Sequence, residues 1–239
     1  MARQVTSTTL DLDADAAQCL AEVITLVRKS RSVTRPEIAT STGLSRTLAT
    51  KYIDVALELN LLQSGEVGQS TGGRAPRLID FNSSAGTILV AELGATGFNV
   101  AASDLNGNLL GTIFTSVEIS DGPDVVLSLV ENSFDDLVSS LKIKNLWGVG
   151  IGVPGPVEFA TGLPVSPPIM PGWDKFPLRE RFSTKYKVPV WVDNDVNLMA
   201  LGEHAQIRNY HPITDRSSPR IHTYPGPRRS RTIARRGTR

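Results

Sequence analysis

Residues 34–62, TRPEIATSTGLSRTLATKYIDVALELNLL, predict two short helices joined at a glycine. Thr34 and Glu37 have the spacing of a capping box, in which each side chain bonds the other residue's backbone N–H. Pro36 falls in the first turn, where a helix tolerates proline because the missing N–H has no partner inside the helix. Gly43 is predicted to end this first helix.

The second helix carries the side chains that point to a function. Ser45 is a favourable N-cap for it. A buried stripe is predicted at spacings of four and three residues, at Leu48, Tyr52, Val55, Leu59 and Leu62. A polar stripe is predicted on another face, at Thr47, Thr50, Lys51 and Asp54. With Arg46 at its start, this helix has the size and chemistry to lie in a DNA major groove.

A helical hairpin whose polar face is merely solvated is the alternative that residues 34–62 leave open. The next stretch, GEVGQSTGGRAPRLI at 65–79, favours DNA binding, because it predicts a glycine-rich β-hairpin with Arg74 and Arg77 near its tip. Two helices followed by a basic hairpin are the order of a winged helix-turn-helix. Arg74 on this wing is expected to meet a phosphate or the minor groove.

The composition limits the classes to which the chain can belong. Its 239 residues give room for a small domain and a larger one. No apolar run reaches the ~20 residues of a membrane-spanning helix, and the first residues lack the order of a secretion signal. Cys19 is the single cysteine, which excludes an internal disulfide and a multi-cysteine zinc site. We therefore expect a cytoplasmic protein that holds no metal or cofactor.

The charge is distributed unevenly along the chain. Residues 205–239 contain nine arginines, no lysine and one acid, Asp215, so they carry 9 − 1 = +8, and the rest of the chain carries 1 − 8 = −7. This segment has four prolines and no apolar periodicity, so we predict an irregular, disordered, Arg/Pro-rich tail. It resembles high-GC coding sequence read out of frame; the alternative is a basic arm that adds nonspecific phosphate contacts.

The N-terminal elements complete one predicted domain. Residues 1–13 are predicted to be a disordered lead, and residues 15–31 a helix that packs beneath the helix pair. Its apolar face is formed by Leu20, Val23, Ile24 and Val27. The winged helix-turn-helix domain is thus predicted over residues 14–82, with a boundary at NSSAG, residues 82–86.

The remainder predicts a second, α/β domain. Its elements, in order, are three antiparallel strands within 87–119, a helix opened by Pro123, a strand at 146–153, a helix at 177–186, a strand at 188–192 and a helix at 196–203. This is the order of one ribonuclease H-like lobe, the repeating half of the superfold of actin, Hsp70 and sugar kinases.

Three short motifs in this lobe could bind a ligand. Residues 150–155, GIGVPG, match G-x-G-x-x-G, but the prolines that follow cannot start a helix, which argues against a dinucleotide site. The turn at 92–96, ELGAT, could present backbone N–H groups to a phosphate, or be only a turn. Residues 193–195, Asp-Asn-Asp, end a strand where they could bond vicinal hydroxyls, or simply cap the next helix.

Together these motifs resemble the ROK family of repressors, open reading frames and sugar kinases, over roughly residues 17–204. The resemblance is carried by the winged helix and then by GGRAPRLIDFN, ELGATGFNVAASDLNGNLL, GVGIGVPGPVEFATG, PPIMPGWDKFPLRERF and VDNDVNLMALGEH. A winged helix is typical of the family's repressor branch, which implies double-stranded operator DNA as the partner. The DNA-facing residues are then expected to be Arg35, Ser45, Arg46, Thr47, Thr50, Lys51 and Arg74.

The resemblance also implies roles in the lobe. The expected sugar contacts are Gly152, Pro154, Gly155, Asn194 and Asp195, where Asp195 corresponds to the base of the kinases and is here vestigial. The expected remnant of the phosphate loop is Glu92, Gly94 and Thr96, where Glu92 replaces the family's aspartate. Ile169 and Met170 stand where many members have a sugar-binding asparagine.

The family would continue after His204 into a second lobe with another phosphate loop, a zinc site and the dimer surface, and residues 205–239 show none of them. Residues 86–204 are therefore interpreted as a truncated sensor lobe, with at best weak sugar binding, no kinase activity and no secure basis for the family's homodimer. The predicted function is a repressor of carbohydrate genes. The alternatives are a sugar kinase-like enzyme and a nonfunctional remnant.

Overall fold

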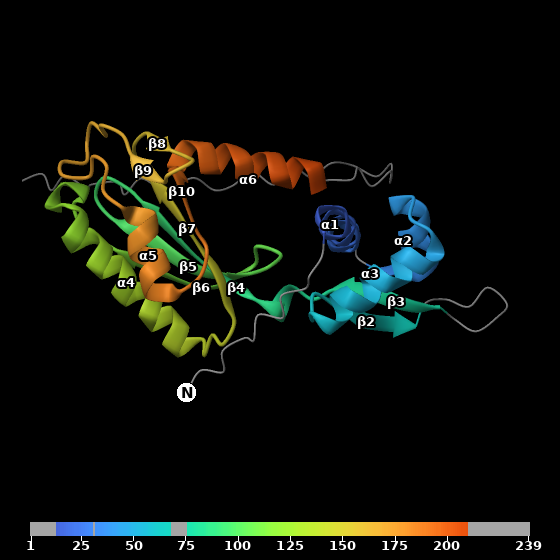
Figure 1. Cartoon of the computed structure of the whole chain (residues 1–239). Helices are drawn as coiled ribbons and strands as arrows, with labels where there is room; N and C mark the ends of the chain where they lie inside the picture. Colours follow the sequence, from blue (N-terminus) through green and yellow to red (C-terminus); the bar gives the residue numbers. More distant parts are fainter. Residues whose placement is uncertain (1–12, 31, 68–75, 210–239) are drawn as a thin grey trace, which may run out of the picture.

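The computed structural model describes residues 13–30, 32–67 and 76–209, which form an N-terminal head (residues 13–81) and a larger lobe (residues 87–209) (Figure 1). The head consists of α1 (Ala14–Lys29), β1 (Val33–Thr34), α2 (Arg35–Thr42), α3 (Arg46–Glu58), β2 (Leu62–Val67) and β3 (Arg77–Phe81). Its three strands form an antiparallel sheet in the order β1-β3-β2.

The predicted helix caps of the head are present. Thr34 and Glu37 form the full capping box of α2, and Gly43 ends that helix with a φ of 71°. The Ser45 side chain accepts a hydrogen bond from the backbone of Leu48 at the start of α3. Thr34 has a second role, because as the last residue of β1 it also pairs with Leu78 of β3. Helix α2 is thereby fixed to the small sheet at its N-cap.

The predicted buried stripe of α3 is confirmed in part: Tyr52 and Leu62 are buried, Val55 and Leu59 are partly buried against the core of the head, and Leu48 is the exception. Leu48 is 42% exposed, and the buried residues are Ala49, Tyr52, Ile53 and Ala56. The pattern of large apolar residues misses Ala49 and Ala56 because these small residues let α3 approach α1 and α2 closely. The core of the head comprises Leu20, Val23, Val27, Ile38, Tyr52, Ile53, Ala56, Leu62 and Ile79.

The lobe is built on a five-stranded sheet in the order β10-β7-β4-β5-β6. Its antiparallel meander is β4 (Thr87–Leu93), β5 (Phe98–Asp104) and β6 (Leu109–Thr115), and β7 (Leu146–Val153) and β10 (Val190–Asn194) extend it in parallel. Helices α4 (Pro123–Ser140) and α5 (Leu178–Tyr186) cover one face, and α6 (Asp195–Asn209) crosses the other (Figure 1). The predicted order of elements in the lobe is confirmed.

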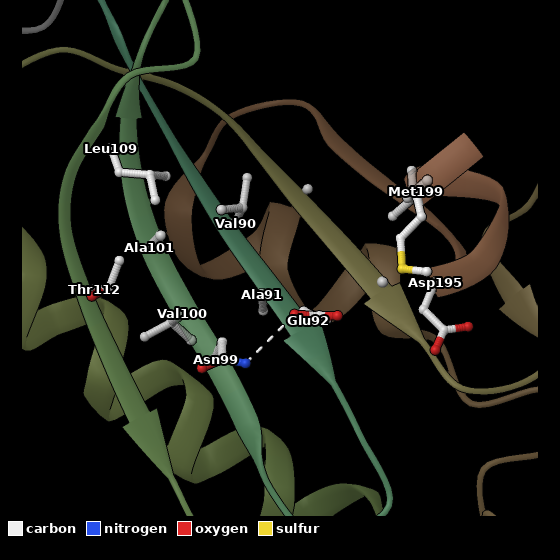
Figure 2. A pocket seen from close by; sticks show the side chains of 13 residues that line it. Val90, Ala91, Glu92, Asn99, Val100, Ala101, Leu109, Thr112, Asp195 and Met199 are labelled. Carbon is white, nitrogen blue, oxygen red and sulfur yellow. Dashed lines mark hydrogen bonds between the residues drawn. The ribbon is translucent and has the colours of Figure 1, made fainter. Parts of the chain in front are cut away.

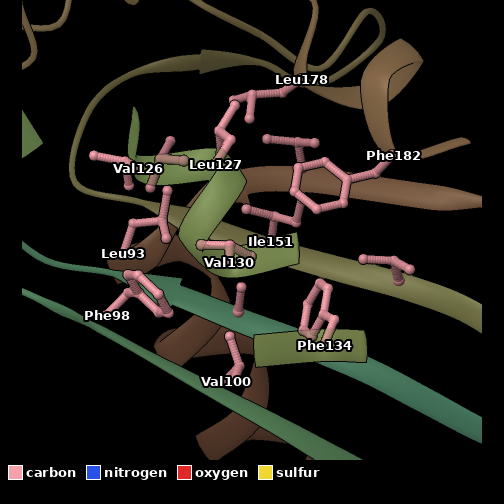
Figure 3. Close-up of a cluster of buried hydrophobic side chains, with 14 of the residues drawn as sticks. Leu93, Phe98, Val100, Val126, Leu127, Val130, Phe134, Ile151, Leu178 and Phe182 are labelled. Atoms are coloured by element: carbon pink, nitrogen blue, oxygen red, sulfur yellow. The ribbon is translucent and has the colours of Figure 1, made fainter. Parts of the chain in front are cut away.

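One face of the sheet carries the core of the lobe. Figure 3 shows Phe134 of α4 and Phe182 of α5 over Ile151 and Val100, and the two rings meet edge to face at 6.0 Å. Because side chains alternate along a strand, the other face of β7 is formed by Gly148, Gly150 and Gly152. Bulky residues thus cover one side of β7, while on the other side Trp191 lies close to Gly148, Leu198 lies close to Gly152, and space remains at Gly150.

Two features of the lobe depart from the sequence predictions. The loop after β7 contains a hairpin of β8 (Val157–Glu158) and β9 (Leu163–Pro164). Helix α6 continues to Asn209, past the predicted end of the lobe at His204 and into the predicted irregular tail. Residues 205–208, AQIR, contain no glycine or proline to stop it, and the first proline is Pro212. The rest of the tail and the lead at 1–12 lie outside the described residues.

The segment at 82–86, which the sequence predicts as a domain boundary, contains regular secondary structure. It contains the short 3₁₀ helix η1 (Ser83–Ala85), which connects β3 to β4. A second 3₁₀ turn, η2 (Ile119–Asp121), precedes α4.

Among the described residues, no helix has both the length and the apolar character to cross a membrane.

Candidate DNA-binding face and sheet cleft

The exposed side of α3 brings together most of the residues predicted to face DNA. We call this surface, formed by Arg46, Thr47, Thr50, Lys51 and Asp54, the α3 outer face; all five are exposed. It exists because the opposite side of the helix, at Ala49, Ile53 and Ala56, is packed against α1 and α2. Ser45 also lies at the surface, where its side chain caps the helix.

Arg35 lies at the start of α2 and reaches the middle of α3. Its Nη2 is 2.8 Å from Oδ1 of Asp54, and the two side chains are 38% and 51% exposed. Within the described part of the chain, its Nη1 is buried and has no hydrogen-bond partner. An ion pair this exposed stabilises little, so its main effect is to hold the guanidinium beside the α3 outer face.

The predicted wing is described at its base alone. Strands β2 and β3 pair from Leu62 opposite Phe81 to Val67 opposite Arg77. Arg77 is exposed at the start of β3. Arg74, the residue predicted to contact DNA from the wing, lies outside the described residues.

In the lobe, the predicted ligand residues meet at one edge of the sheet. Parallel strands share their direction, so the carboxyl ends of β4, β7 and β10 lie side by side, with Gly152 between Glu92 and Asp193. Ligands in open α/β sheets bind outside such strand ends. The three sequence motifs therefore lie at neighbouring strand ends.

Asn194 uses its whole amide inside the protein. Its Nδ2 donates to the carbonyl oxygens of Gly155 (3.0 Å) and Val153 (3.4 Å), and its Oδ1 accepts from the backbone N–H groups of Val196 (3.0 Å) and Asn197 (3.3 Å). Two donors and two acceptor sites are all that an asparagine side chain offers. The residue caps α6 and fixes the loop after β7, which leaves its predicted sugar contact without a free group.

Asp195 faces a hollow on the open side of the sheet. The hollow has a volume of about 690 Å³. It is lined by Val90, Ala91, Glu92, Asn99, Val100, Ala101, Leu109, Thr112, Gly150, Gly152, Asp195, Leu198 and Met199. Figure 2 shows Asp195 and Met199 on one side of it and Glu92 with Asn99 on the other. Its floor is open because a Cβ at Gly150 would meet no atom closer than Val90 Cγ1, at 3.7 Å.

The loop after β7 is shaped by close packing. A Cβ on Gly155 would lie 2.7 Å from Cβ of Pro167 and 3.3 Å from Sδ of Met170, so only glycine fits. Met170 is buried beneath the loop, and Ile169 is exposed. The position where a polar sugar partner is common in the family is thus filled by an apolar side chain that supports Gly155. Pro154, the other predicted contact in this loop, is half-buried.

The predicted phosphate turn is a closed hairpin turn. The N–H of Gly94 donates to the carbonyl oxygen of Gly97 at 2.8 Å, so it is not available to a phosphate. Glu92 accepts a long hydrogen bond from Asn99, at 3.5 Å, and Thr96 is exposed at the tip. Across the described ranges, no cluster of three or more His, Cys, Asp or Glu could hold a metal ion.

Sequence reasoning missed several residues that line the hollow. Asn99, Thr112 and Met199 come from β5, β6 and α6. The alternation of β5, in which Asn99 interrupts apolar neighbours, was a usable signal for the first of them. Met199 carried no signal, because only the fold shows that α6 crosses the open face.

Comparison with known proteins places the chain among ROK proteins. The family model described as "ROK family" matches residues 88–212, slightly more than half of the chain. The xylose repressor of Caldicellulosiruptor bescii is 27% identical over 186 residues, which are 76% of this chain and 46% of the relative. A glucokinase of Halalkalibacterium halodurans is 30% identical over 114 residues, 47% of this chain and 34% of the relative.

A solved structure shares the fold over most of the chain. The ROK family transcriptional regulator that is a homolog of the E. coli MLC protein superposes with a TM-score of 0.64 at 21% identity, covering 81% of this chain and 50% of that one. The chain spans about half the length of the curated relatives that it matches.

Proposed function

The chain belongs to the ROK family, and on that basis we propose that it is a transcriptional repressor of carbohydrate genes whose head is a winged helix-turn-helix bound to double-stranded operator DNA. The observation that carries the proposal is the α3 outer face, where Arg46, Thr47, Thr50 and Lys51 are exposed together. In this arrangement α3 lies in the major groove and the wing contacts the backbone or minor groove through Arg74.

The extent of the matches supports a regulator over an enzyme. The xylose repressor matches 186 residues, more than the 88–212 range of the ROK model contains, so its similarity reaches into the head. The glucokinase matches 114 residues, which that range can hold entirely. A head shared with a repressor is the part that a DNA-binding function needs.

The lobe is proposed to be the sensor. A sugar effector would bind at the hollow, with Asp195 as its polar contact, since carboxylates bond vicinal hydroxyls well. The surface around that carboxylate is mostly apolar, with Val90, Ala101 and Met199 nearby. Few hydrogen-bonding groups converge there, so weak affinity is expected from this chain.

DNA binding by α3 can be tested by fluorescence anisotropy on the chain's own upstream DNA. Arg46→Ala and Lys51→Ala are each expected to weaken binding about tenfold and to reduce the slope of log affinity against log salt by about one. Lys144→Ala is the matched control, because it removes an exposed cation from the lobe. Binding that is lost on deletion of residues 205–239 but unaffected by both alanines would make the tail the DNA contact and overturn the proposal.

Sugar phosphorylation is the second candidate, favoured by the Asp195 carboxylate at the hollow and by the glucokinase match. Incubation with ATP and a panel of hexoses tests it directly. Turnover that Asp195→Ala abolishes would establish an enzyme; absence of turnover with every hexose would leave the regulator.

A further inference from the structure

Asn82 fastens the segment between the two domains to the head. It is only 8% exposed. Its Nδ2 donates to the carbonyl oxygen of Asn60 (2.9 Å), and its backbone N–H donates to that of Leu61 (3.0 Å). Both acceptors belong to the turn that follows α3, a turn closed by the bond from Leu61 N to Ala56 O (2.9 Å). Asn82 is therefore bonded to the turn that directly follows the proposed DNA-reading helix.

The same segment is fastened to the lobe from the other side. The carbonyl oxygen of Ser83 accepts from the N–H of Leu105 (3.0 Å), and that of Ala85 accepts from Nδ2 of Asn145 (3.3 Å). Ser84 closes the turn itself, because its hydroxyl donates to Oδ1 of Asn82 (2.7 Å). Each residue of η1 is thus held by a hydrogen bond.

The acid at the end of β5 adds to this anchorage. Burial raises the pKa of Asp104, but hydrogen bonds from Asn108, from the Ser83 side chain and from the turn backbone outweigh it, so the pKa lies below its ordinary value. The carboxylate therefore stays ionised at neutral pH and keeps its bond to Ser83.

Steric packing supports the hydrogen bonds. A Cβ added to Gly86 would lie 2.5 Å from the indole ring of Trp147, which shows that the ring lies directly on the backbone at this glycine. Trp147 belongs to β7, and the same strand continues to Gly152 at the floor of the hollow. One strand thus joins the contact at Gly86 to the proposed sensor site.

We infer that residues 82–86 form a rigid joint that fixes the head to the lobe as one body, with Asn82 as the residue that positions α3. The composition NSSAG is that of a flexible linker, and motion between domains is the usual expectation for such a segment. The bonds on both sides of the joint oppose that motion. Only the assignment of α3 to operator binding rests on the proposed function; the rigidity of the joint does not.

The width of one distance distribution tests the joint in the full-length chain. Spin labels are placed at Ala17→Cys in α1 and Asn132→Cys in α4, both exposed positions, in a Cys19→Ser background, and pulsed dipolar spectroscopy measures the distance between them. A rigid joint gives a single narrow distribution. Asn82→Ala removes the bonds to Asn60 and Ser84 and is expected to broaden it, while the control Asn106→Ala, an exposed turn asparagine, leaves it unchanged.

A second substitution loosens the joint from the lobe side. Asn145→Ala removes the side-chain bond to Ala85 and is also expected to broaden the distribution, so the test remains decisive if Asn82→Ala fails to fold. A broad distribution in the unsubstituted joint, or a narrow one in both variants with native circular dichroism, overturns the inference. Affinity for a single operator half-site is measured in parallel. Absence of binding to the half-site would contradict the proposed function, but it would not change what the distance distribution says about the joint.

Discussion

The head and the lobe present their candidate functional residues in different ways. On the α3 outer face, the side chains project from one helix into solvent, so their common exposure follows from helix geometry alone. At the cleft, Asn194 and Asp195 are consecutive but differ in role. The amide of Asn194 hydrogen-bonds to Val153, Gly155 and the start of α6, whereas Asp195 faces the hollow. A helix face can therefore be read as a group, whereas residues at a strand end must be judged one by one.

The head and the lobe have separate hydrophobic cores, so a substitution in the core of the lobe tests the stability of the lobe by itself. Phe134 is fully buried among Phe182, Ile151 and other lobe residues, and none of them belongs to the core of the head (Figure 3). Phe134→Ala is expected to destabilise the lobe by about 3–5 kcal/mol, as measured by chemical denaturation. Phe159→Ala, which truncates an exposed phenylalanine of the same lobe, is expected to change stability by less than about 0.5 kcal/mol. Equal effects of the two substitutions would refute the assigned core.

The contrast between Asn194 and Asp195 can be sharpened by paired substitutions. Asn194→Ala leaves two carbonyl groups and two N–H groups without their partner, so a loss of about 1–3 kcal/mol in unfolding free energy is expected. Asp195→Ala removes a single hydrogen bond, from the N–H of Val196 (2.9 Å), so it is expected to lower the unfolding free energy less than Asn194→Ala does and to abolish any sugar binding seen by calorimetry. If Asp195→Ala proved the more destabilising of the two, the roles assigned here would be reversed.

In the head, the cap of α3 offers a smaller effect. Ser45→Ala removes the side-chain bond to the Leu48 N–H and is expected to cost about 1 kcal/mol of stability. Differential scanning calorimetry of the chain would show this as a lower transition temperature. Ser41→Ala, an exposed serine within α2, is the matched control and is expected to leave the transition in place.

The smallest expected effect is a dependence on pH at the start of α2. Hydrogen bonds from the Thr34 backbone and side chain hold the pKa of Glu37 below its ordinary value of 4.5. Because the pKa is lower in the folded state, the capping box stabilises the head above pH 4.5 and loses that contribution as the pH falls further. Glu37→Gln is expected to flatten this part of the stability profile, and an unchanged profile would show that the box contributes nothing measurable.

Local signals were sufficient where structure is set by neighbours in sequence. The capping box at Thr34 and Glu37, the stop at Gly43 and the strand with glycines on one face were all predicted and are present. The α3 stripe failed at Leu48, because packing against α1 and α2 selects the small residue Ala49 over a larger neighbour. The size and hydrophobicity of the residues alone do not show which side of α3 packs closely against the neighbouring helices.

Contacts between distant segments explain the remaining failures. Strand β1 exists because Val33 pairs with Ile79, and the β8–β9 hairpin forms at 157–164, where no element was predicted. The bonds of Asn194 depend on the path of a loop about forty residues earlier, which no local motif describes. The convergence of Glu92, Gly152 and Asp193 was predictable, because the direction of parallel strands determines it.

The double role of Thr34 has a consequence for how the head would meet a duplex. This one residue closes the ladder to β3 and caps α2, so the strand that leads from the wing and the helix that precedes α3 share an anchor. The distance between the proposed groove contact of α3 and the proposed backbone contact of the wing is then fixed within the head. Substitution at this threonine would alter the reach of both contacts together, without touching either group that makes them.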